Sequence, residues 1–198
     1  AAMNPKKGEV LALVSTPGYD PNEFIAGLSD ARWKELSEDE KNPMLNRFSQ
    51  AWVPGSTFKA VTAAIGVESG KLDANANLGY EAGLRWQKDA LWGDYYVTTL
   101  TDYGAEVNLR NAMVYSDNIY FEKAALQIGG DELEKAFLKM GFEEEMEFPI
   151  YMQPSSYSNA EEGEDTFVSD IQLADTGYGQ GALLVNPLHL LSMYSMFV

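Results

Sequence analysis

The sequence predicts an α+β fold, because one strand-like segment is followed mostly by segments with helical spacing of apolar residues, without regular alternation of the two. The near-continuous apolar run at residues 9–15 predicts a strand that is covered on both faces. The 198 residues, 45% of them hydrophobic, suffice for a sizeable core and argue against disorder.

Composition excludes several classes of function. The formal net charge of −16 argues against nucleic acid as a partner, since its binding needs clustered Lys and Arg. The chain has no cysteine and a single histidine, His189, which excludes thiolate metal sites and sites built on two histidines. The acidic cluster at residues 143–147 lacks the alternating oxygen-ligand spacing of a calcium loop, so we expect no metal, and we expect no cofactor. His189 falls beside the apolar face of the last predicted helix, and we expect it to be structural.

The N-terminal residues predict a turn, a strand, a loop and a helix in that order. Residues 4–8 form the turn that leads into the strand, and residues 15–22 form a loop that contains two proline breakers. Residues 29–41 predict a short exposed helix with Ser29 or Asp30 as its N-cap.

The stretch WVPGSTFKAVTAAIGVESG, residues 52–70, predicts a turn followed by a helix that ends at Gly70. Its apolar face is formed by Phe58, Val61, Ala64 and Ile65. Ser56 then lies at or beside the first helical position, and Lys59 lies about one turn later on the same side.

The rest of the chain predicts a short strand or extended loop within residues 85–100, and then further helices. Asn108, Asp131 and Asn186 are the expected N-caps of three of them. The predicted helices cover residues 108–114, 119–128, 131–141, 170–175 and 186–198.

Ser56 and Lys59 are either a helix cap and a surface charge, or a nucleophile and its base. A serine hydroxyl is a weak nucleophile that needs a nearby base, and a lysine serves if burial lowers its pKa to roughly 7–8. The triplet SDN at residues 116–118 follows at a break between two helices. There Ser116 could relay a proton and Asn118 could bind substrate, although the triplet, and Asp117 in particular, could also be a helix cap.

Four stretches together resemble the transpeptidase domain of class B penicillin-binding proteins, in the right order over nearly the whole chain. They are GEVLALVSTPGYDPN, PGSTFK, SDN and GYGQG followed by VNPLHLLSMYS. RWQKDALWG and LADTGYGQG look most similar to the low-affinity, methicillin-resistance-type branch of Gram-positive bacteria. The resemblance implies the penicillin-binding-protein and serine β-lactamase-like fold, here its helix-rich part with an N-terminal strand.

The resemblance also implies a D,D-transpeptidase that cross-links peptidoglycan stem peptides ending in D-Ala-D-Ala. Ser56 would be the nucleophile, Lys59 its base, and Ser116 and Asn118 the second motif. Gly179, Gln180 and Gly181 would shape the substrate-binding cleft. β-Lactam antibiotics would acylate the same serine, and other cell-wall synthesis proteins are possible partners. The expected location is the extracytoplasmic face of the membrane, with an N-terminal anchor helix outside this chain.

Two enzyme-related alternatives and one structural alternative stay open. A serine β-lactamase shares the first motifs, but the E-x-x-L-N string of class A enzymes is absent. A β-lactam-sensing receptor domain has similar motifs, but the segment at residues 8–22 favours the penicillin-binding proteins. A non-catalytic domain would leave the joint presence of Ser56, Lys59 and SDN as coincidence.

The sequence departs from the family pattern because no K-T-G or similar triplet follows residue 116. We therefore expect residues 1–198 to be a partial transpeptidase domain that lacks its C-terminal part and is inactive on its own. Acylation of the isolated chain by a fluorescent penicillin at a normal rate would refute this expectation.

Overall fold

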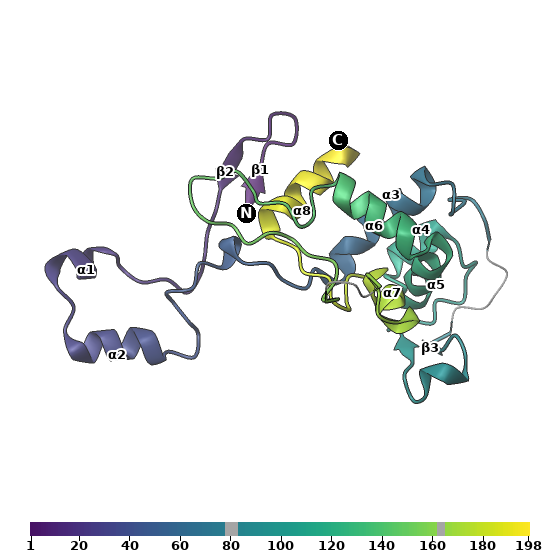
Figure 1. Ribbon diagram of the computed structural model, residues 1–198, viewed down its shortest axis with the longest axis horizontal. Coiled ribbons are helices and arrows are strands. Elements are labelled where there is room, and N and C mark those ends of the chain that lie inside the picture. The colour runs from purple at the N-terminus through teal and green to yellow at the C-terminus, as the bar shows by residue number, and fades with distance from the viewer. Residues whose placement is uncertain (78–82, 162–164) are drawn as a thin grey trace. The chain divides into compact units, whose positions relative to one another are not determined.

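The computed structural model describes residues 1–77, 83–161 and 165–198 (Figure 1). The chain divides into two compact units. The terminal unit comprises Ala1–Ala51, Glu145–Gln153 and Asn186–Val198, and the helical unit comprises Trp52–Glu144 and Pro154–Val185.

The helical unit consists of short helices and one small β-hairpin. Helix α5 packs most extensively against α7 and next against α3 (Figure 1). The hairpin pairs β3 with β4 in antiparallel register, Arg85 opposite Thr98 and Trp86 opposite Val97. The elements are η2 Gly55–Phe58, α3 Lys59–Glu68, β3 Arg85–Trp86, η3 Ala90–Trp92, β4 Val97–Thr98, α4 Leu109–Val114, α5 Asn118–Ile128, α6 Gly130–Lys139 and α7 Asp170–Thr176.

The core of the helical unit surrounds α5. Most residues of α5 are apolar, and neighbouring helices bury them. Ile119, Tyr120 and Phe121 on three consecutive positions are all buried. Phe58 packs on Phe137 at 5.8 Å between ring centroids. This packing holds the start of α3 in place, and Ser56 and Lys59 lie at that start.

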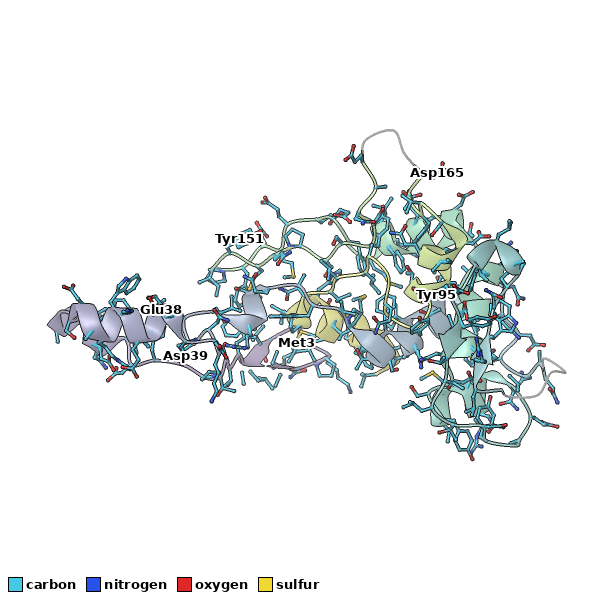
Figure 2. The ribbon with its side chains drawn as sticks, turned by 90° about the horizontal axis from the view of Figure 1, so that it is seen from below. Met3, Glu38, Asp39, Tyr95, Tyr151 and Asp165 are labelled. Atoms are coloured by element: carbon cyan, nitrogen blue, oxygen red, sulfur yellow. The ribbon has the colours of Figure 1, made fainter. Side chains whose placement is uncertain are left out.

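The terminal unit contains a two-stranded hairpin and the C-terminal helix. Helix α8 packs against β1 and against η1. Its elements are β1 Ala2–Met3, β2 Val10–Ala12, α1 Asn22–Ala26, α2 Asp30–Glu38, η1 Arg47–Ser49, α8 Pro187–Tyr194 and η4 Ser195–Phe197. Asp39 follows α2 as its C-cap (Figure 2). Among the described helices, none is both long and apolar enough to cross a membrane.

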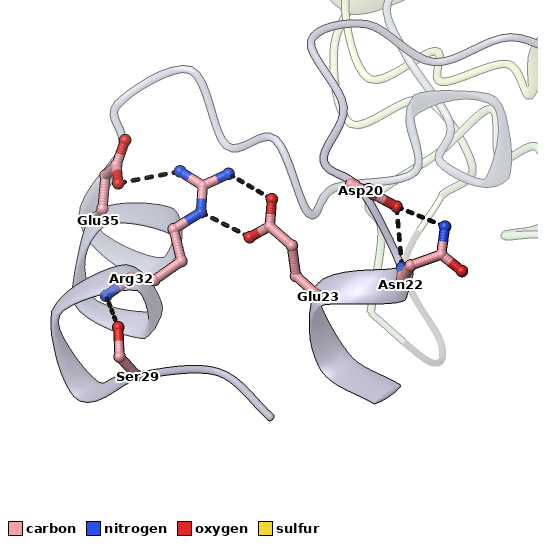
Figure 3. A network of polar contacts seen from close by, with 6 residues as sticks. All are labelled: Asp20, Asn22, Glu23, Ser29, Arg32 and Glu35. Atoms are coloured by element: carbon pink, nitrogen blue, oxygen red, sulfur yellow. Dashed lines mark hydrogen bonds and ion pairs between the residues drawn. The ribbon is translucent and has the colours of Figure 1, made fainter. Parts of the chain in front are cut away.

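Helices α1 and α2 lie between β2 and η1, and ion pairs connect the two helices (Figure 3). Arg32 donates to both carboxylate oxygens of Glu23, at 2.7 and 3.2 Å, and pairs with Glu35 at 2.9 Å. The hydroxyl of Ser29 accepts from the Arg32 amide and caps α2. Because these groups are partly exposed, the network orients the two helices more than it stabilises them.

Several predicted elements are confirmed. Ser29, Asn108 and Asn186 each cap a helix with a side-chain acceptor. Gly70 follows α3 with φ +70°. The predicted strand-or-loop region contains the β3–β4 hairpin, while residues 78–82 lie outside the described part of the chain. His189 is buried in α8, in agreement with a structural role.

Two predictions are wrong. The strand is shorter than residues 9–15 and is not covered on both faces, since Leu11 is 67% and Val14 74% exposed. The apolar run misleads because β2 pairs with a strand of only two residues, and nothing in the described structure covers Leu11. Asp131 is not an N-cap: α6 begins at Gly130, so Asp131 lies in its first turn.

Candidate active site

The first part of the site is the turn that opens α3. Gly55 has φ +57°, and the Thr57 hydroxyl donates to the carbonyl of Pro54 at 2.7 Å. Ser56 lies in the 3₁₀ turn that follows, and its side chain is exposed. Lys59 is the first residue of α3 and is only 1% exposed. The predicted position of both residues at the start of the helix is confirmed, with the Ser56 hydroxyl exposed and the Lys59 side chain buried.

The second part of the site is the break between α4 and α5. Asp117 caps α5, accepting from the amides of Ile119 at 2.9 Å and Tyr120 at 3.2 Å. The phenol of Tyr103 donates to its other oxygen at 2.9 Å. This confirms the capping role expected for Asp117. The cap leaves the residues on either side of it free to project towards Lys59.

Ser116, just before this cap, has a backbone conformation that is rare for a residue with a side chain. Its φ is +53°, in the left-handed region, which costs about 1–2 kcal/mol outside glycine. Residues held in this way cluster at functional sites, where the surrounding structure over-determines them. Here the conformation directs both the carbonyl and the hydroxyl of Ser116 to the same amine.

The amine of Lys59 joins the two parts. It donates to the Ser116 carbonyl at 2.7 Å, to the Ser116 hydroxyl at 2.9 Å and to Asn118 Oδ1 at 2.6 Å. These three acceptors match the three N–H donors of an ammonium. Asn118 in turn donates its Nδ2 to the carbonyl of Thr98 at 2.8 Å.

The described hydrogen bonds link Ser56 to Lys59 through Ser116 rather than directly. The hydroxyl of Ser116 donates to Ser56 Oγ at 3.0 Å and accepts from Lys59 Nζ. Since hydroxyl protons rotate, the same chain of oxygens can carry a proton from Ser56 towards a neutral amine. Ser116 thus occupies the position that a proton relay needs.

Burial sets the protonation of Lys59. Desolvation lowers its pKa to about 8, against the opposing charge of Asp117, which raises it. This value agrees with the range that the sequence argument required of a lysine base. At pH 7 about a tenth of the molecules then hold the neutral amine, compared with well under a hundredth for an ordinary lysine.

The third part of the site is the turn at residues 178–181. The amide of Gly55 donates to the carbonyl of Gly179 at 2.9 Å. A Cβ on Gly179 would lie 2.1 Å from the Gly55 carbonyl oxygen, so only glycine permits this approach. The bridge between Trp52 and Val185 pairs the flanking segments. Gly179 therefore reaches the residue before Ser56, whereas the Gln180 side chain is exposed and Gly181 contacts α7.

Sequence reasoning did not single out Thr98 or Tyr103, although both hold the second motif in place. Each makes its contact through a fold that brings together separate segments, and no local pattern marks such a contact. Among residues 1–77, 83–161 and 165–198, no group of three or more His, Cys, Asp or Glu side chains is placed to hold a metal ion.

A family model for the penicillin binding protein transpeptidase domain matches residues 1–198. Penicillin-binding protein 3 of Bacillus subtilis (strain 168) is 46% identical over 197 residues, which cover 100% of this chain and 29% of that protein. Peptidoglycan D,D-transpeptidase MrdA of Acinetobacter baumannii is 29% identical over 204 residues, which cover 96% of this chain and 28% of that protein. The chain thus spans less than a third of the length of these curated relatives.

A solved structure gives the same result for the fold. The ceftriaxone acyl-enzyme complex of penicillin-binding protein A from M. tuberculosis has a TM-score of 0.82 to this chain at 25% identity. The match covers 98% of this chain and 43% of that chain. The fold that the sequence motifs implied is confirmed.

The lowered pKa of Lys59 predicts that folding stability rises with pH. Between its folded value of about 8 and the ordinary value of 10.5, the unfolded chain keeps a proton that the folded chain has lost. From pH 8 to pH 10, the free energy of unfolding should therefore increase by about 2 kcal/mol relative to Lys59→Met, which cannot titrate. Urea unfolding of both proteins across this range measures the difference. Parallel profiles would contradict the lowered pKa.

The backbone of Ser116 predicts an unusual order of stability between two variants that both lack the hydroxyl. Ser116→Gly should be more stable than Ser116→Ala by roughly 0.5–1 kcal/mol, because relief of the left-handed strain outweighs the entropy cost of glycine. The control is Ser69, with φ −73°, where the alanine variant should be the more stable. The urea midpoints of the glycine and alanine variants at both positions measure these differences. If the alanine variant is the more stable one at both positions, strain at Ser116 is excluded.

Proposed function

The chain belongs to the penicillin-binding protein transpeptidase family, and from this premise we propose that Ser56 is the nucleophile of a peptidoglycan D,D-transpeptidase. The observation that carries the proposal is the line of three groups from the exposed Ser56 hydroxyl through the Ser116 hydroxyl to the buried Lys59 amine. A buried amine with a pKa of about 8 is a competent base at neutral pH. The Acinetobacter relative is named a peptidoglycan D,D-transpeptidase, which supports the reaction class.

The proposed acylation moves one proton and exchanges one bond. Ser56 Oγ attacks the carbonyl of the penultimate D-alanine of a stem peptide, while its proton passes through Ser116 to the neutral amine of Lys59. The bond from that carbonyl to the terminal D-alanine nitrogen breaks, and the same proton leaves with the released D-alanine. The product is an ester on Ser56.

The second half of the reaction runs the same groups in reverse. An amine of a neighbouring peptidoglycan strand attacks the ester carbonyl and gives up a proton towards Lys59. The proton returns to Ser56 Oγ as the ester bond breaks and the cross-link forms. N–H groups at the first turn of the helix, which lack partners inside it, are the candidates to hold the negatively charged oxygen.

Asn118 has two tasks in this proposal. Its Oδ1 accepts from Lys59 and thereby orients the base, and its Nδ2 donates to Thr98. The second N–H of Nδ2 is the group that we assign to the substrate backbone. We assign Gly179, Gln180 and Gly181 to the other side of the proposed cleft, which the hydrogen bond from the Gly55 amide to Gly179 supports.

For the whole protein, we propose stem peptides ending in D-Ala-D-Ala as donors and β-lactams as covalent inhibitors. The ceftriaxone complex of the M. tuberculosis relative supports the second part. The substrate places the reaction at the extracytoplasmic face of the membrane, with other cell-wall synthesis proteins as partners. Membership of the low-affinity, methicillin-resistance-type branch rests on RWQKDALWG and LADTGYGQG and stays a prediction.

The test uses the full-length protein that carries this chain, incubated with a fluorescent penicillin. We expect one covalent adduct on the tryptic peptide of residues 48–59 and its complete loss in Ser56→Ala, because no other group there has an activated oxygen. Ser69→Ala, which removes a hydroxyl at the far end of α3, is the matched control and should be labelled normally. The labelling rate should increase up to pH of about 8, where Lys59 loses its proton.

Other outcomes separate the competing functions. Release of D-alanine from a stem peptide with formation of a new amide supports the transpeptidase. Rapid turnover of the penicillin would instead indicate a β-lactamase, and a stable adduct without any peptide product would indicate a receptor. Labelling that survives in Ser56→Ala would overturn the assignment of the nucleophile.

A further inference from the structure

A second polar cluster lies in the helical unit, centred on Asp175 of α7. A single carboxylate oxygen of Asp175 accepts from two phenols, Tyr95 and Tyr178, at 2.5 Å each. The two phenol oxygens lie 3.4 Å apart, so the hydroxyls converge on that oxygen. Tyr95, which is labelled in Figure 2, comes from the segment between η3 and β4, and Tyr178 comes from the turn after α7.

Apolar side chains cover part of the cluster. Tyr95 and Tyr178 pack against a buried group formed by Trp92, Val97, Ile119 and Ala174. Burial, followed by the hydrogen bond to Asp175, raises the pKa of Tyr95 to about 12 and that of Tyr178 still further. Both phenols therefore remain hydrogen-bond donors at neutral pH.

A buried neutral acid completes the surroundings of Asp175. Glu122 of α5 is fully buried, and neither of its carboxyl oxygens has a hydrogen-bond partner among the described residues. Burial, with the nearby charge of Asp175, raises the pKa of Glu122 to about 9. Glu122 is thus uncharged at neutral pH and does not repel the carboxylate of Asp175.

The turn that carries Tyr178 is attached to the end of α7. The amides of Tyr178 and Gln180 both donate to the carbonyl of Asp175, at 3.2 and 3.0 Å. Gly177 anchors the same end to α5, since a Cβ there would lie 2.2 Å from the Phe121 carbonyl oxygen. The side chain and the backbone of Asp175 therefore hold the turn at two points.

The residue 178–181 turn packs tightly against the turn that carries Gly55 and Ser56. Gly179 accepts from the Gly55 amide, and the two backbones are so close that not even a methyl group fits between them. Gly55 is directly bonded to Ser56. A shift of the residue 178–181 turn therefore changes the position of Gly55 and, with it, of Ser56 Oγ relative to Ser116.

We propose that Asp175 is a positioning residue for Ser56: its carboxylate, held by Tyr95 and Tyr178, keeps the residue 178–181 turn against Gly55. The inference rests on the proposed function of Ser56 as nucleophile. Asp175 itself touches neither Ser56 nor Lys59, and its effect passes through Gly179. A displacement of about 1 Å in such a support can lower a rate on the order of 100-fold.

The test compares variants of the full-length protein in acylation by a penicillin, separating the dissociation constant of the initial complex from the acylation rate constant. Tyr178→Phe and Asp175→Ala should lower the rate constant roughly 10- to 100-fold, which exceeds the change in the dissociation constant that the shifted cleft residues 179–181 cause. Asp175→Asn should recover most of the rate, because its Oδ1 can still accept from both phenols. Glu122→Gln is the matched control, buried in the same place and also neutral, and should stay within about twofold of the native rate.

Two further readouts keep positioning distinct from loss of fold and from failure of the proposed function. The pH midpoint of acylation should be unchanged in the variants, since Lys59 keeps its surroundings, and urea midpoints report the folded fraction. Native rate constants in the folded Tyr178→Phe and Asp175→Ala proteins would overturn the positioning role. If the native protein is acylated at a residue other than Ser56, the proposed function is overturned instead, regardless of the rate constants of the variants.

Discussion

The site depends on keeping one amine, that of Lys59, out of water. An ammonium so buried is unfavourable unless its donors are satisfied, and here three oxygens from the α4–α5 break satisfy them. The same burial lowers the pKa of the amine to about 8, a value that the proposed role as base requires. The position of Ser116, the capping of α5 and the packing of Phe58 all serve to keep that environment closed.

The residues around Lys59 are held in place by a local helix cap and by contacts between segments that are distant in the sequence. Asp117 caps α5 and also contributes the negative charge that limits the fall in the pKa of Lys59. Tyr103 and Thr98 fix the break from a separate segment of the chain. On the other side, Asp175 organises the turn that meets Gly55. Ser56 and Lys59 are therefore held by three segments that lie apart in the sequence.

Local chemistry made much of the site predictable. The turn-to-helix signal around Pro54 and Gly55 located Ser56 and Lys59, and the polar triplet at residues 116–118 marked the helix break. What depends on tertiary contacts was not predictable from one sequence. The relay geometry through Ser116, the roles of Thr98 and Tyr103, and the exposure of Leu11 follow from which segments meet. The error at Asp131 has a local cause, because Gly129 and Gly130 end one helix and begin the next with no side-chain cap.

The junction between Gly55 and Gly179 is made by main chain on both sides. Because a Cβ on residue 179 would lie 2.1 Å from the Gly55 carbonyl oxygen, substitution there would disrupt the junction outright and could not adjust it gradually. Sequence variation that leaves this junction intact has to arise in the residues that surround it. The backbone spacing between Gly55 and Gly179 would then stay constant while the side chains around it change.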